Sequence, residues 1–326
     1  MENIRMAKYL ITGIAGFIGS SLARALIDRG EEVRGVDNYL TGKAENLDGY
    51  EHRIDFREYD LRDAAAMRVA CEGIEYVLHI GALPSVPLSV EKPEPSHRCN
   101  VDGTFNVLEG ARAAGVKRVI YAASSSAYGD QPILPSKESM RPMPISPYAV
   151  QKLAGEYYMS SYWQVYGLET VSLRYFNVFG PRQGAGSPYS GVLAKFIQQM
   201  LTGVRPTIFG TGEQGRDFTY IDNVISANLL ACEAPADKVA GKVFNIACGG
   251  QYSLIEVYRL LAKMIGFEPT PVYAPARTGD ILNSQADISA AAEAFGYRPL
   301  IGVREGLERT VEWYREKMNL PVAKTR

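Results

Sequence analysis

Thr12-Gly13-Ile14-Ala15-Gly16-Phe17-Ile18-Gly19 is the stretch of sequence that decides the fold. The apolar run 9–12 predicts a strand before it, and the apolar residues of 17–29 recur at near-helical spacing, with Gly30 as a stop signal. A strand, a glycine-rich turn and a helix in this order are typical of a nucleotide-binding βα unit. The glycines are spaced G-x-x-G-x-x-G, one residue longer than the simpler dinucleotide fingerprint.

The glycine turn has the chemistry needed to hold a pyrophosphate. Glycine lacks a Cβ, so the backbone turns tightly and a phosphate can approach it closely. The helix that follows offers free N–H groups and partial positive charge at its N-terminus. We therefore expect a dinucleotide to bind at Gly13, Gly16, Phe17, Ile18 and Gly19.

An acidic residue follows the turn at the distance that a nucleotide site requires. Asp37 lies 18 residues beyond Gly19, at the end of the second expected strand. A carboxylate there accepts both ribose hydroxyls of NAD and repels the 2′-phosphate of NADP. No arginine follows at once, since the next residue is Asn38, and Asp60-Leu61 after the third strand is expected at the adenine. The alternative, a glycine turn that only packs a helix on a strand, does not explain Asp37.

The first half of the chain continues to alternate between the two patterns. Strands are expected at 33–36, 54–59, 76–80, 119–123 and 170–175, and helices at 64–70, 100–114 and 147–166. Short buried strands separated by helices indicate a parallel, doubly wound sheet with helices on both faces. After Gly180 the pattern is less regular and richer in glycine and proline, although 243–246 resembles one more buried strand. We predict an α/β protein with a Rossmann-type domain over 1–179 and a smaller α/β substrate lobe over 180–326, interleaved through that strand.

Composition excludes several classes of protein. The 326 residues are 46% hydrophobic and 22% charged, with a net charge of -1, which is typical of a globular protein and gives no attraction to nucleic acid or an anionic membrane. The chain has no apolar run long enough to span a bilayer and no secretory signal at its start. Four unpaired cysteines and three scattered histidines predict reduced thiols, no metal site and a cytoplasmic protein.

Three residues form a candidate catalytic group. Ser124 ends an expected strand, and ligands of open parallel sheets bind outside the carboxyl ends of strands. Tyr148 and Lys152 are four residues apart on the next helix, so they share one face. A lysine ammonium lowers the pKa of a nearby phenol, which makes a tyrosine base plausible. The alternative is a tyrosine packed at a helix start beside a solvated lysine.

These motifs together resemble those of extended short-chain dehydrogenase/reductases. The resemblance rests on five segments in order along nearly the whole chain: Gly13 to Gly19, the serines at 124 to 126, Tyr128-Gly129-Asp130, Tyr148-Ala-Val-Gln-Lys152 and Leu173-Arg-Tyr-Phe-Asn177. Within that family the chain is most similar to UDP-sugar 4-epimerases, which hold NAD tightly and recycle it. The resemblance implies that Tyr148 removes the proton of the 4-hydroxyl while NAD takes hydride from C4, and that the 4-keto sugar then rotates within the site. Hydride would return to the opposite face of C4, and Ser124 or Tyr148 would supply the proton.

The resemblance also assigns further binding residues. For the cofactor it implies Lys152 at the nicotinamide ribose, His79 and Ile80 to Leu83 along the dinucleotide (with Gly81 and Ala82), and also Asn100 and Tyr175. For the UDP-sugar it implies Asn177, Arg216 and Arg277 at the diphosphate, Thr207 and Phe209 at the uracil, Asp280 at the uridine ribose, and Ser85, Ser125, Ser126 and Ser284 near the sugar.

Two positions bear on which reaction and which sugar are expected. Family dehydratases and decarboxylases carry a carboxylate just after the residue equivalent to Ser124, whereas this chain has Ser125-Ser126. Epimerases restricted to UDP-glucose and UDP-galactose place a bulky tyrosine at the position of Ser284, and a serine opens the pocket to an N-acetyl group at C2. The alternative to a larger pocket is that Ser284 is only a small loop residue whose space another side chain fills.

We therefore expect an NAD-dependent 4-epimerase of UDP-GlcNAc and UDP-GalNAc, with UDP-glucose and UDP-galactose as further substrates. A UDP-glucuronate 4-epimerase, or an enzyme limited to UDP-glucose and UDP-galactose, remains open. The alternative of another class is a non-catalytic NAD-binding regulator. A homodimer is expected through the aromatic-rich helix 157–166, although those aromatic side chains equally suit an intramolecular core.

Overall fold

A computed structural model describes residues 8–186, 191–276 and 281–321. Its centre is a parallel sheet in the order β3-β2-β1-β4-β5-β6-β11, with seven strands among the described residues. The strands are β1 (Lys8–Thr12), β2 (Glu32–Asp37), β3 (Ile54–Glu58), β4 (Tyr76–His79), β5 (Arg118–Ser124), β6 (Glu169–Tyr175) and β11 (Lys242–Ile246). The strand order reverses between β1 and β4, so a crevice opens there at the carboxyl ends of the strands.

Alternating apolar side chains explain why the sheet is covered on both faces. In β1, Leu10 packs into one core cluster while Ile11 packs into the other. In β5, Val119 and Ile120 divide in the same way. Successive strand residues point to opposite faces, so each of these fully buried strands supplies two cores.

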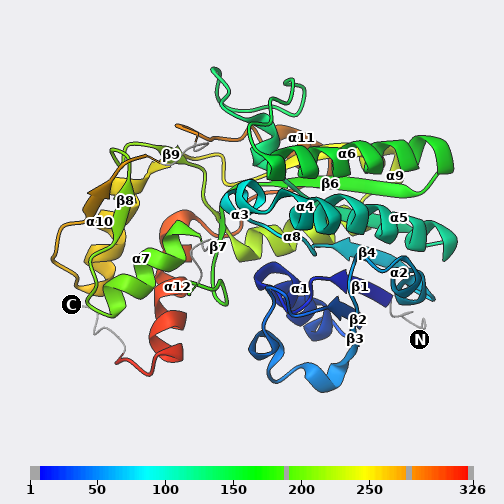
Figure 1. The fold of residues 1–326 in the computed structure, drawn as a ribbon, viewed down its shortest axis with the longest axis horizontal. Helices are drawn as coiled ribbons and strands as arrows, with labels where there is room; N and C mark the ends of the chain where they lie inside the picture. Colours follow the sequence, from blue (N-terminus) through cyan, green and yellow to red (C-terminus); the bar gives the residue numbers. More distant parts are fainter. Residues whose placement is uncertain (1–7, 187–190, 277–280, 322–326) are drawn as a thin grey trace.

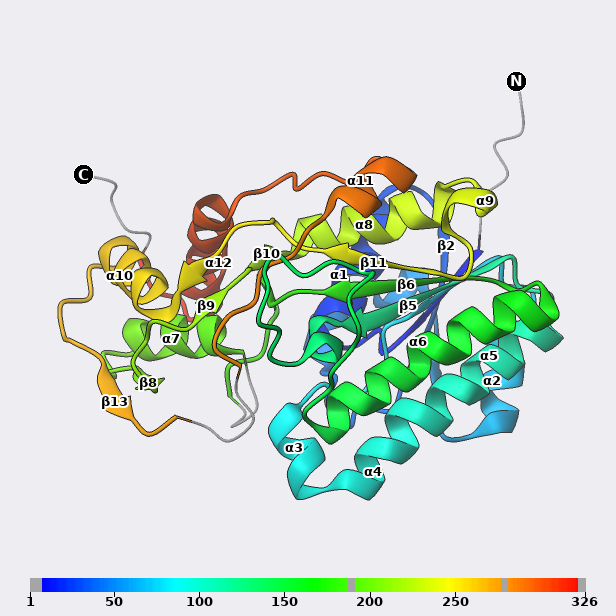
Figure 2. The ribbon, with the colours of Figure 1, turned by 90° about the horizontal axis from the view of Figure 1, so that it is seen from above.

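Helices cover the two faces, as Figure 2 shows. On one side lie α2 (Ala64–Cys71), α5 (Gly103–Ala113) and α6 (Pro147–Tyr166), and on the other α1 (Phe17–Asp28), α8 (Ile221–Glu233), α9 (Ala236–Val239) and α11 (Ser289–Phe295). This arrangement confirms the predicted α/β class with a Rossmann-type doubly wound sheet.

One region departs from the predicted helix over 100–114. A π-helical turn, Arg98–Asp102, comes before α5, and the short helices α3 (Val86–Glu91) and α4 (Pro93–His97) precede it. Both short helices have a proline in their first turn, where a missing N–H is tolerated. We made no prediction for residues 86–97, where the two helices are only six and five residues long and give no clear periodic pattern.

The smaller lobe is more regular than the sequence pattern indicated (Figure 1). Its helices are α7 (Val192–Leu201), α10 (Leu254–Ile265) and α12 (Val303–Lys317), which pack on one another. A capping box, in which Ser253 and Glu256 bond each other's backbone, starts α10, and Gly266 ends it. The helices and short strands of this lobe agree with the predicted smaller α/β lobe, and the capping signal of α10 was in the sequence.

Short strand pairs complete the structure. β7 (Val178–Phe179) pairs with β10 (Thr219–Tyr220), β9 (Gly215–Arg216) with β12 (Tyr252–Ser253), and β8 (Thr207–Phe209) with β13 (Val272–Ala274). Short 3-10 turns lie at Ala44–Leu47, Glu51–Arg53 and Ser125–Tyr128.

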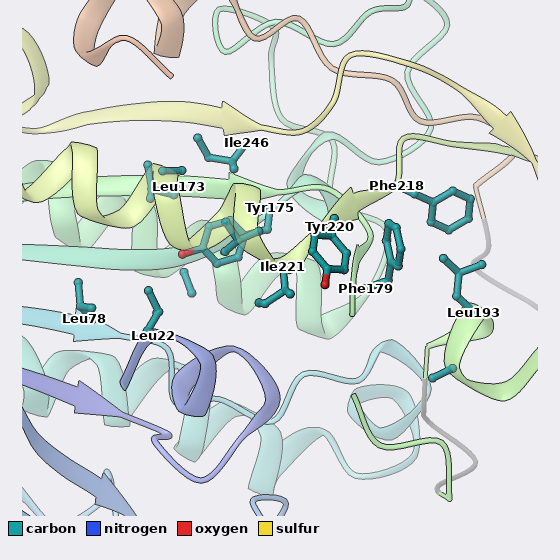
Figure 3. Close-up of a cluster of buried hydrophobic side chains, with 14 of the residues drawn as sticks. Leu22, Leu78, Leu173, Tyr175, Phe179, Leu193, Phe218, Tyr220, Ile221 and Ile246 are labelled. Carbon is teal, nitrogen blue, oxygen red and sulfur yellow. The ribbon is translucent and has the colours of Figure 1, made fainter. Parts of the chain in front are cut away.

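One apolar core continues from the sheet into the smaller lobe (Figure 3). Leu22 and Leu78 belong to the same cluster as Phe218 and Leu193 of the smaller lobe. Phe179 joins the two parts, with its ring centroid 5.6 Å from that of Tyr220 in an edge-to-face contact. Because no polar layer divides this core, the two lobes pack as one body.

Candidate active site

A cavity of about 510 Å³ lies at the carboxyl ends of the strands, where the strand order reverses. It is lined by nearly all of the residues predicted for the cofactor: Gly13, Gly16, Phe17, Ile18, Gly19, Asp37, Asn38, Asp60, Leu61, Ile80, Gly81, Ala82, Tyr148, Lys152 and Tyr175. Ser124 and Asn177 line it as well. The fold thus brings residues from distant parts of the chain into one site.

The glycine turn packs backbone against backbone more closely than a side chain would allow. Gly13 has a φ of +68°, and a Cβ on it would meet the Gly81 Cα at 2.7 Å. A Cβ on Gly19 would meet the carbonyl oxygen of Gly13 at 2.1 Å. No side chain caps α1 at Gly16, so the N–H groups of its first turn face the cavity without a side-chain acceptor. The turn therefore fits the pyrophosphate of a dinucleotide.

Asp37 is fixed at the end of β2 by backbone donors. The Ala15 N–H donates to its Oδ2 at 2.9 Å and the Tyr39 N–H to its Oδ1 at 2.8 Å. Burial raises the pKa of this carboxyl, while the bonds from Tyr39 and Ala15 act in the opposite direction. Each carboxylate oxygen accepts more than one hydrogen bond, so Asp37 can still receive ribose hydroxyls.

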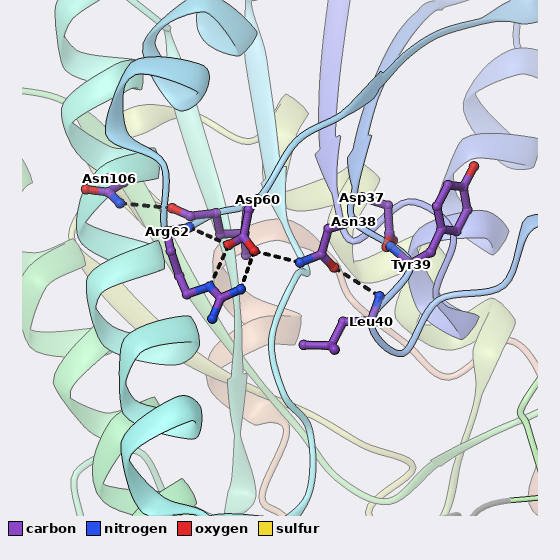
Figure 4. Close-up of polar contacts among 8 residues, drawn as sticks. Asp37, Asn38, Tyr39, Leu40, Asp60, Arg62 and Asn106 are labelled. Atoms are coloured by element: carbon purple, nitrogen blue, oxygen red, sulfur yellow. Dashed lines mark hydrogen bonds and ion pairs between the residues drawn. The ribbon is translucent and has the colours of Figure 1, made fainter.

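A polar network closes the side of the cavity beyond Asp37 (Figure 4). Asp60 accepts from Asn38 Nδ2 at 2.9 Å and pairs with Arg62 through Nε at 2.8 Å and Nη2 at 2.5 Å. The Arg62 hydrogen bonds hold the pKa of Asp60 far below its usual range. Asp60 therefore stays ionised, with its carboxylate held between Asn38 and Arg62. Sequence reasoning missed Arg62, which lines the cavity.

The three catalytic candidates meet at the cavity wall. Ser124 ends β5, and its side chain hydrogen-bonds the Tyr148 hydroxyl. Ser126 Oγ donates to Ser124 Oγ at 2.9 Å, which fixes the serine. Lys152 Nζ donates to the carbonyl oxygen of Ala122 at 2.8 Å and lies 4.9 Å from the Tyr121 ring centroid. The lysine is thus anchored by the strand that carries Ser124.

Burial sets the proton affinities of this group. It raises the pKa of Tyr148 to about 12, although the Ser124 hydrogen bond lowers it, and it lowers the pKa of Lys152 to about 8. The direction for Tyr148 is opposite to our expectation of a phenol acidified by Lys152. The reason is that the ammonium is held by Ala122 O, and desolvation is the larger effect. A positively charged nicotinamide ring beside the phenol would lower the pKa of Tyr148.

Replacing Lys152 with methionine is expected to stabilise the protein when no NAD is bound. The folded-state pKa of Lys152, about 8, lies below the usual 10.5, so folding is opposed by the charged form. That cost is complete below pH 8 and disappears as pH rises to 10.5. The shift corresponds to about 3 kcal/mol, and losing the bond to Ala122 O offsets about 1 kcal/mol of it.

Urea unfolding of the native protein and of Lys152→Met measures this difference in stability. The variant should be about 2 kcal/mol more stable at pH 7, and the difference should shrink between pH 8 and pH 10. Lys152→Arg, which keeps the charge, is the control and should gain nothing. A variant less stable than the native protein at pH 7 would contradict the prediction.

Two residues expected at the cofactor lie behind the cavity wall. Asn100 does not line the cavity; its Oδ1 accepts from the Leu83 N–H at 2.7 Å, and its Nδ2 donates to Gln151 Oε1 at 2.8 Å. His79 is also enclosed, between Thr12 and Thr104. The reason is topological: β4 is central, so its last side chain points into the core, and only the backbone that follows reaches the cavity.

Asn177 connects the sheet to the smaller lobe. Its backbone has a φ of +34°, and its Nδ2 donates to the carbonyl oxygen of Asp217 at 3.0 Å and to Ser284 Oγ at 3.2 Å. The Asp217 carboxylate accepts backbone N–H bonds from Cys248, Gly249 and Ala286. These contacts hold the segment around Ser284 against the end of β6.

Among the described residues, the other predicted substrate residues are not part of the cavity lining. Arg216 donates to the backbone carbonyls of Ile281 and Leu282 at 2.7 and 3.0 Å. Thr207 and Phe209 lie in β8 of the smaller lobe. Ser85 caps α3, and Ser125 and Ser126 form the turn after β5. The predicted Arg277 and Asp280 lie outside the described residues.

The described residues also bear on metal binding and on membrane insertion. No three His, Cys, Asp or Glu side chains within residues 8–186, 191–276 and 281–321 lie in an arrangement that could hold a metal ion. None of the helices in the part of the chain that the structure describes has the length and apolarity needed to cross a bilayer.

The sequence signature of the NAD dependent epimerase/dehydratase family matches residues 9–247, well over half of the chain. This protein belongs to that family. The prediction of an NAD-dependent enzyme of the epimerase type is thereby confirmed. The family match covers the glycine turn, the catalytic group and β11.

Solved structures of members of the NAD dependent epimerase/dehydratase family are similar over nearly their full length. They include the UDP-glucose 4-epimerase of Thermotoga maritima with UDP-glucose, at 38% identity and a TM-score of 0.91, covering 95% of this chain and 99% of that chain. The UDP-N-acetylglucosamine 4-epimerase of Methanobrevibacter ruminantium, with UDP-N-acetylmuramic acid, has 37% identity, a TM-score of 0.91, and coverage of 97% and 100%. The UDP-glucuronic acid 4-epimerase of Bacillus cereus, with UDP-glucuronic acid and NAD, has 32% identity, a TM-score of 0.89, and coverage of 95% and 99%.

Proposed function

We propose that this NAD-dependent UDP-sugar 4-epimerase interconverts UDP-GlcNAc and UDP-GalNAc, with UDP-glucose and UDP-galactose as further substrates. The single observation that carries the proposal is Ser284. Its side chain is small, it is 6% exposed, and it receives a hydrogen bond from Asn177, which lines the cavity. A tyrosine at this position would add a ring beside Asn177, and the proposal assigns the volume of that ring to a C2 N-acetyl group.

The catalytic residues have distinct roles in the proposed reaction. Tyr148 takes the proton of the sugar 4-hydroxyl, and Ser124, held by Ser126, hydrogen-bonds the same oxygen. Lys152 lies at the cofactor side, fixed by Ala122 O, and binds the nicotinamide ribose. NAD, when bound, supplies the hydride acceptor and donor at C4. After the 4-keto sugar rotates, return of the hydride to the opposite face of C4 would invert that carbon, and Tyr148 or Ser124 returns the proton to the 4-oxygen.

The two lobes divide the two ligands in this proposal. Residues 1–179, together with β11, form the lobe that holds NAD. The rest of residues 180–326 form the lobe that holds the UDP-sugar. Asn177, Arg216 and the segment that follows Leu282 meet between the lobes. The diphosphate is placed there because arginine and asparagine donors suit phosphate oxygens.

Product analysis with three UDP-sugars tests the substrate assignment. The purified protein is incubated separately with UDP-GlcNAc, UDP-glucose and UDP-glucuronate, without added reductant, and the products are separated by anion-exchange chromatography. Formation of UDP-GalNAc supports the proposal. Conversion of UDP-glucuronate alone would keep the mechanism and overturn the substrate, and conversion of none with NAD bound would favour a non-catalytic regulator.

Enlarging position 284 is expected to shift the substrate preference. Ser284→Tyr should lower the ratio of kcat/KM for UDP-GlcNAc to that for UDP-glucose by roughly 10–100-fold, because steric exclusion of a few atoms is worth about 1–3 kcal/mol. Ser284→Ala is the matched control, since it removes the bond from Asn177 without adding volume. An unchanged ratio in Ser284→Tyr would show that this position does not face C2.

A homodimer through α5 and α6 is also proposed. These helices pack side by side, and the ring centroids of Phe105 on α5 and Tyr158 on α6 lie 5.8 Å apart. Phe105, Tyr158 and the adjacent Tyr157 are 41%, 38% and 63% exposed. Aromatic side chains grouped on a surface are typical of protein interfaces. Light scattering should give twice the chain mass, and Tyr157→Lys should give a monomer. A monomeric native protein would refute the dimer without affecting the epimerase assignment.

A further inference from the structure

His79 is an enclosed histidine at the end of β4, directly behind the cavity. It is 1% exposed, its Nδ1 lies 2.8 Å from Thr12 Oγ1, and its Nε2 lies 2.9 Å from Thr104 Oγ1. Its ring stacks on that of Tyr121, with centroids 5.5 Å apart. Since His79 does not line the cavity, any influence on the reaction passes through its neighbours.

The hydrogen bonds of Thr12 and Thr104 determine which ring nitrogen of His79 carries the proton. The Thr104 hydroxyl donates its one proton to the carbonyl oxygen of Asn100 at 2.7 Å, so its oxygen accepts from His79 Nε2–H. The Gly81 N–H donates to Thr12 Oγ1 at 3.0 Å, which leaves the Thr12 hydroxyl proton for His79 Nδ1. The opposite tautomer would leave the Thr12 proton and the Asn100 carbonyl without these partners.

Burial keeps this imidazole neutral. It lowers the pKa of His79 to about 3, with the nearby Lys152 ammonium acting in the same direction. The other ring that faces it, Tyr121, has a strongly raised pKa and carries no charge. One nitrogen of His79 therefore always accepts and the other always donates.

The two nitrogens act on the two ends of one cavity-lining loop. On one side, Thr12 holds the N–H of Gly81, whose Cα is the first atom that a Cβ on Gly13 would meet. On the other, Thr104 holds Asn100, which accepts from the Leu83 N–H and donates to the Leu83 carbonyl. The loop between them, Gly81 to Leu83, lines the cavity.

The same asparagine reaches the catalytic helix. Asn100 Nδ2 donates at 2.8 Å to Oε1 of Gln151, the neighbour of Lys152 in α6. A run of buried hydrogen bonds with a single direction thus leads from the Gly81 N–H through Thr12, His79 and Thr104 to the backbone carbonyl of Asn100. The side chain of Asn100 bonds separately to the 81–83 loop and to the catalytic helix.

We propose that His79 is a positioning residue that acts as a neutral Nε2–H bridge, setting the distance between the glycine turn and the loop Gly81 to Leu83 so that the crevice fits a dinucleotide. The proposal rests on the assignment of this cavity to NAD. It assigns no proton transfer to His79. Its effect is on cofactor affinity, through the placement of backbone that lines the cavity.

The tautomer is tested by NMR of the protein labelled with ¹⁵N-histidine, without NAD. His52 and His97 are exposed, which distinguishes them from the enclosed His79. We expect one histidine protonated at Nε2 only. Thr104→Val removes the acceptor of Nε2–H and should convert His79 to the Nδ1–H form, whereas Thr12→Val should leave it at Nε2–H. A native protein with Nδ1–H, or an unchanged tautomer in Thr104→Val, would overturn the proposal.

Cofactor affinity is the second measurement. The dissociation constant of NAD, followed by calorimetry, should rise about tenfold in Thr12→Val and in Thr104→Val, as expected for one lost buried hydrogen bond in a loop that contacts ligand. Thr170→Val is the matched control: its hydroxyl is also buried and bonds a helix carbonyl, Met159 O at 2.6 Å, away from the loop. Its NAD affinity should stay within about twofold of the native value.

The outcomes separate the two proposals. Native affinity in both threonine variants, or an equal loss in the Thr170→Val control, would refute the positioning role. A native protein that does not bind NAD would instead refute the assignment of the cavity, while the NMR experiment would still decide the tautomer of His79.

Discussion

Tyr148→Phe is expected to lower the turnover of the UDP-sugar about a thousandfold, because a positioned acid–base group contributes roughly 10²–10⁴-fold. The phenol hydroxyl is the proton acceptor of the proposed reaction, and phenylalanine keeps the ring while removing it. Ser124, which hydrogen-bonds Tyr148, lacks a base to activate it once the phenol is gone. NAD affinity should change little, since the glycine turn and Asp37 are untouched.

Single-turnover and steady-state assays on the purified variant check this prediction. Tyr162→Phe is the matched control, because it removes a buried hydroxyl from the same helix, one that donates to Glu109 at 2.7 Å far from the cavity. The control should keep most of its turnover. If Tyr148→Phe retained more than a tenth of the native rate, the base would have to be another group, and a non-catalytic role for Tyr148 would follow.

Gly19→Ala is expected to abolish measurable NAD binding, a loss of at least a hundredfold. A Cβ at this position would lie 2.1 Å from the Gly13 carbonyl oxygen, 2.8 Å from the Gly13 carbonyl carbon and 2.9 Å from the Ile14 Cα. All three are backbone atoms of the turn itself, so the methyl group can be accommodated only if the turn moves. A displaced turn no longer presents its N–H groups to the pyrophosphate.

Calorimetric titration with NAD and circular dichroism on the same sample measure this effect. Gly302→Ala is the control, since a Cβ there meets open space at the start of α12. It should bind NAD as the native protein does. A folded Gly19→Ala protein with native affinity for NAD would mean that the pyrophosphate does not lie on this turn.

The sheet could be predicted from the sequence because its signal is local. The strands 76–79 and 118–124 are apolar and bounded by turn residues, and the glycine turn fixes the first βα unit. The helices α7 and α10 were not predicted because glycine and proline are frequent after Gly180, although the capping box at Ser253 marks the start of α10.

The candidate site was predictable where a motif carries it and not where tertiary packing decides. The cofactor residues cluster as expected because they follow strand ends that a parallel sheet aligns. Nothing in the local sequence reveals that Asn100 faces Leu83, that Gln151 bonds Asn100, or that Arg62 clamps Asp60. Those contacts depend on which segments the fold brings together.

The position of β11 at the edge of the sheet has a consequence for synthesis on the ribosome. Its partner β6 is complete at Tyr175, but β11 begins only at Lys242, after α7, the small strands and α8 have been made. Until then the N–H and C=O groups of β6 on that side are unpaired, and the apolar core shared by both lobes is incomplete. The nascent chain therefore exposes an unpaired, aggregation-prone strand edge for an extended period of translation. A gene fragment that ends near residue 179 would make this state permanent.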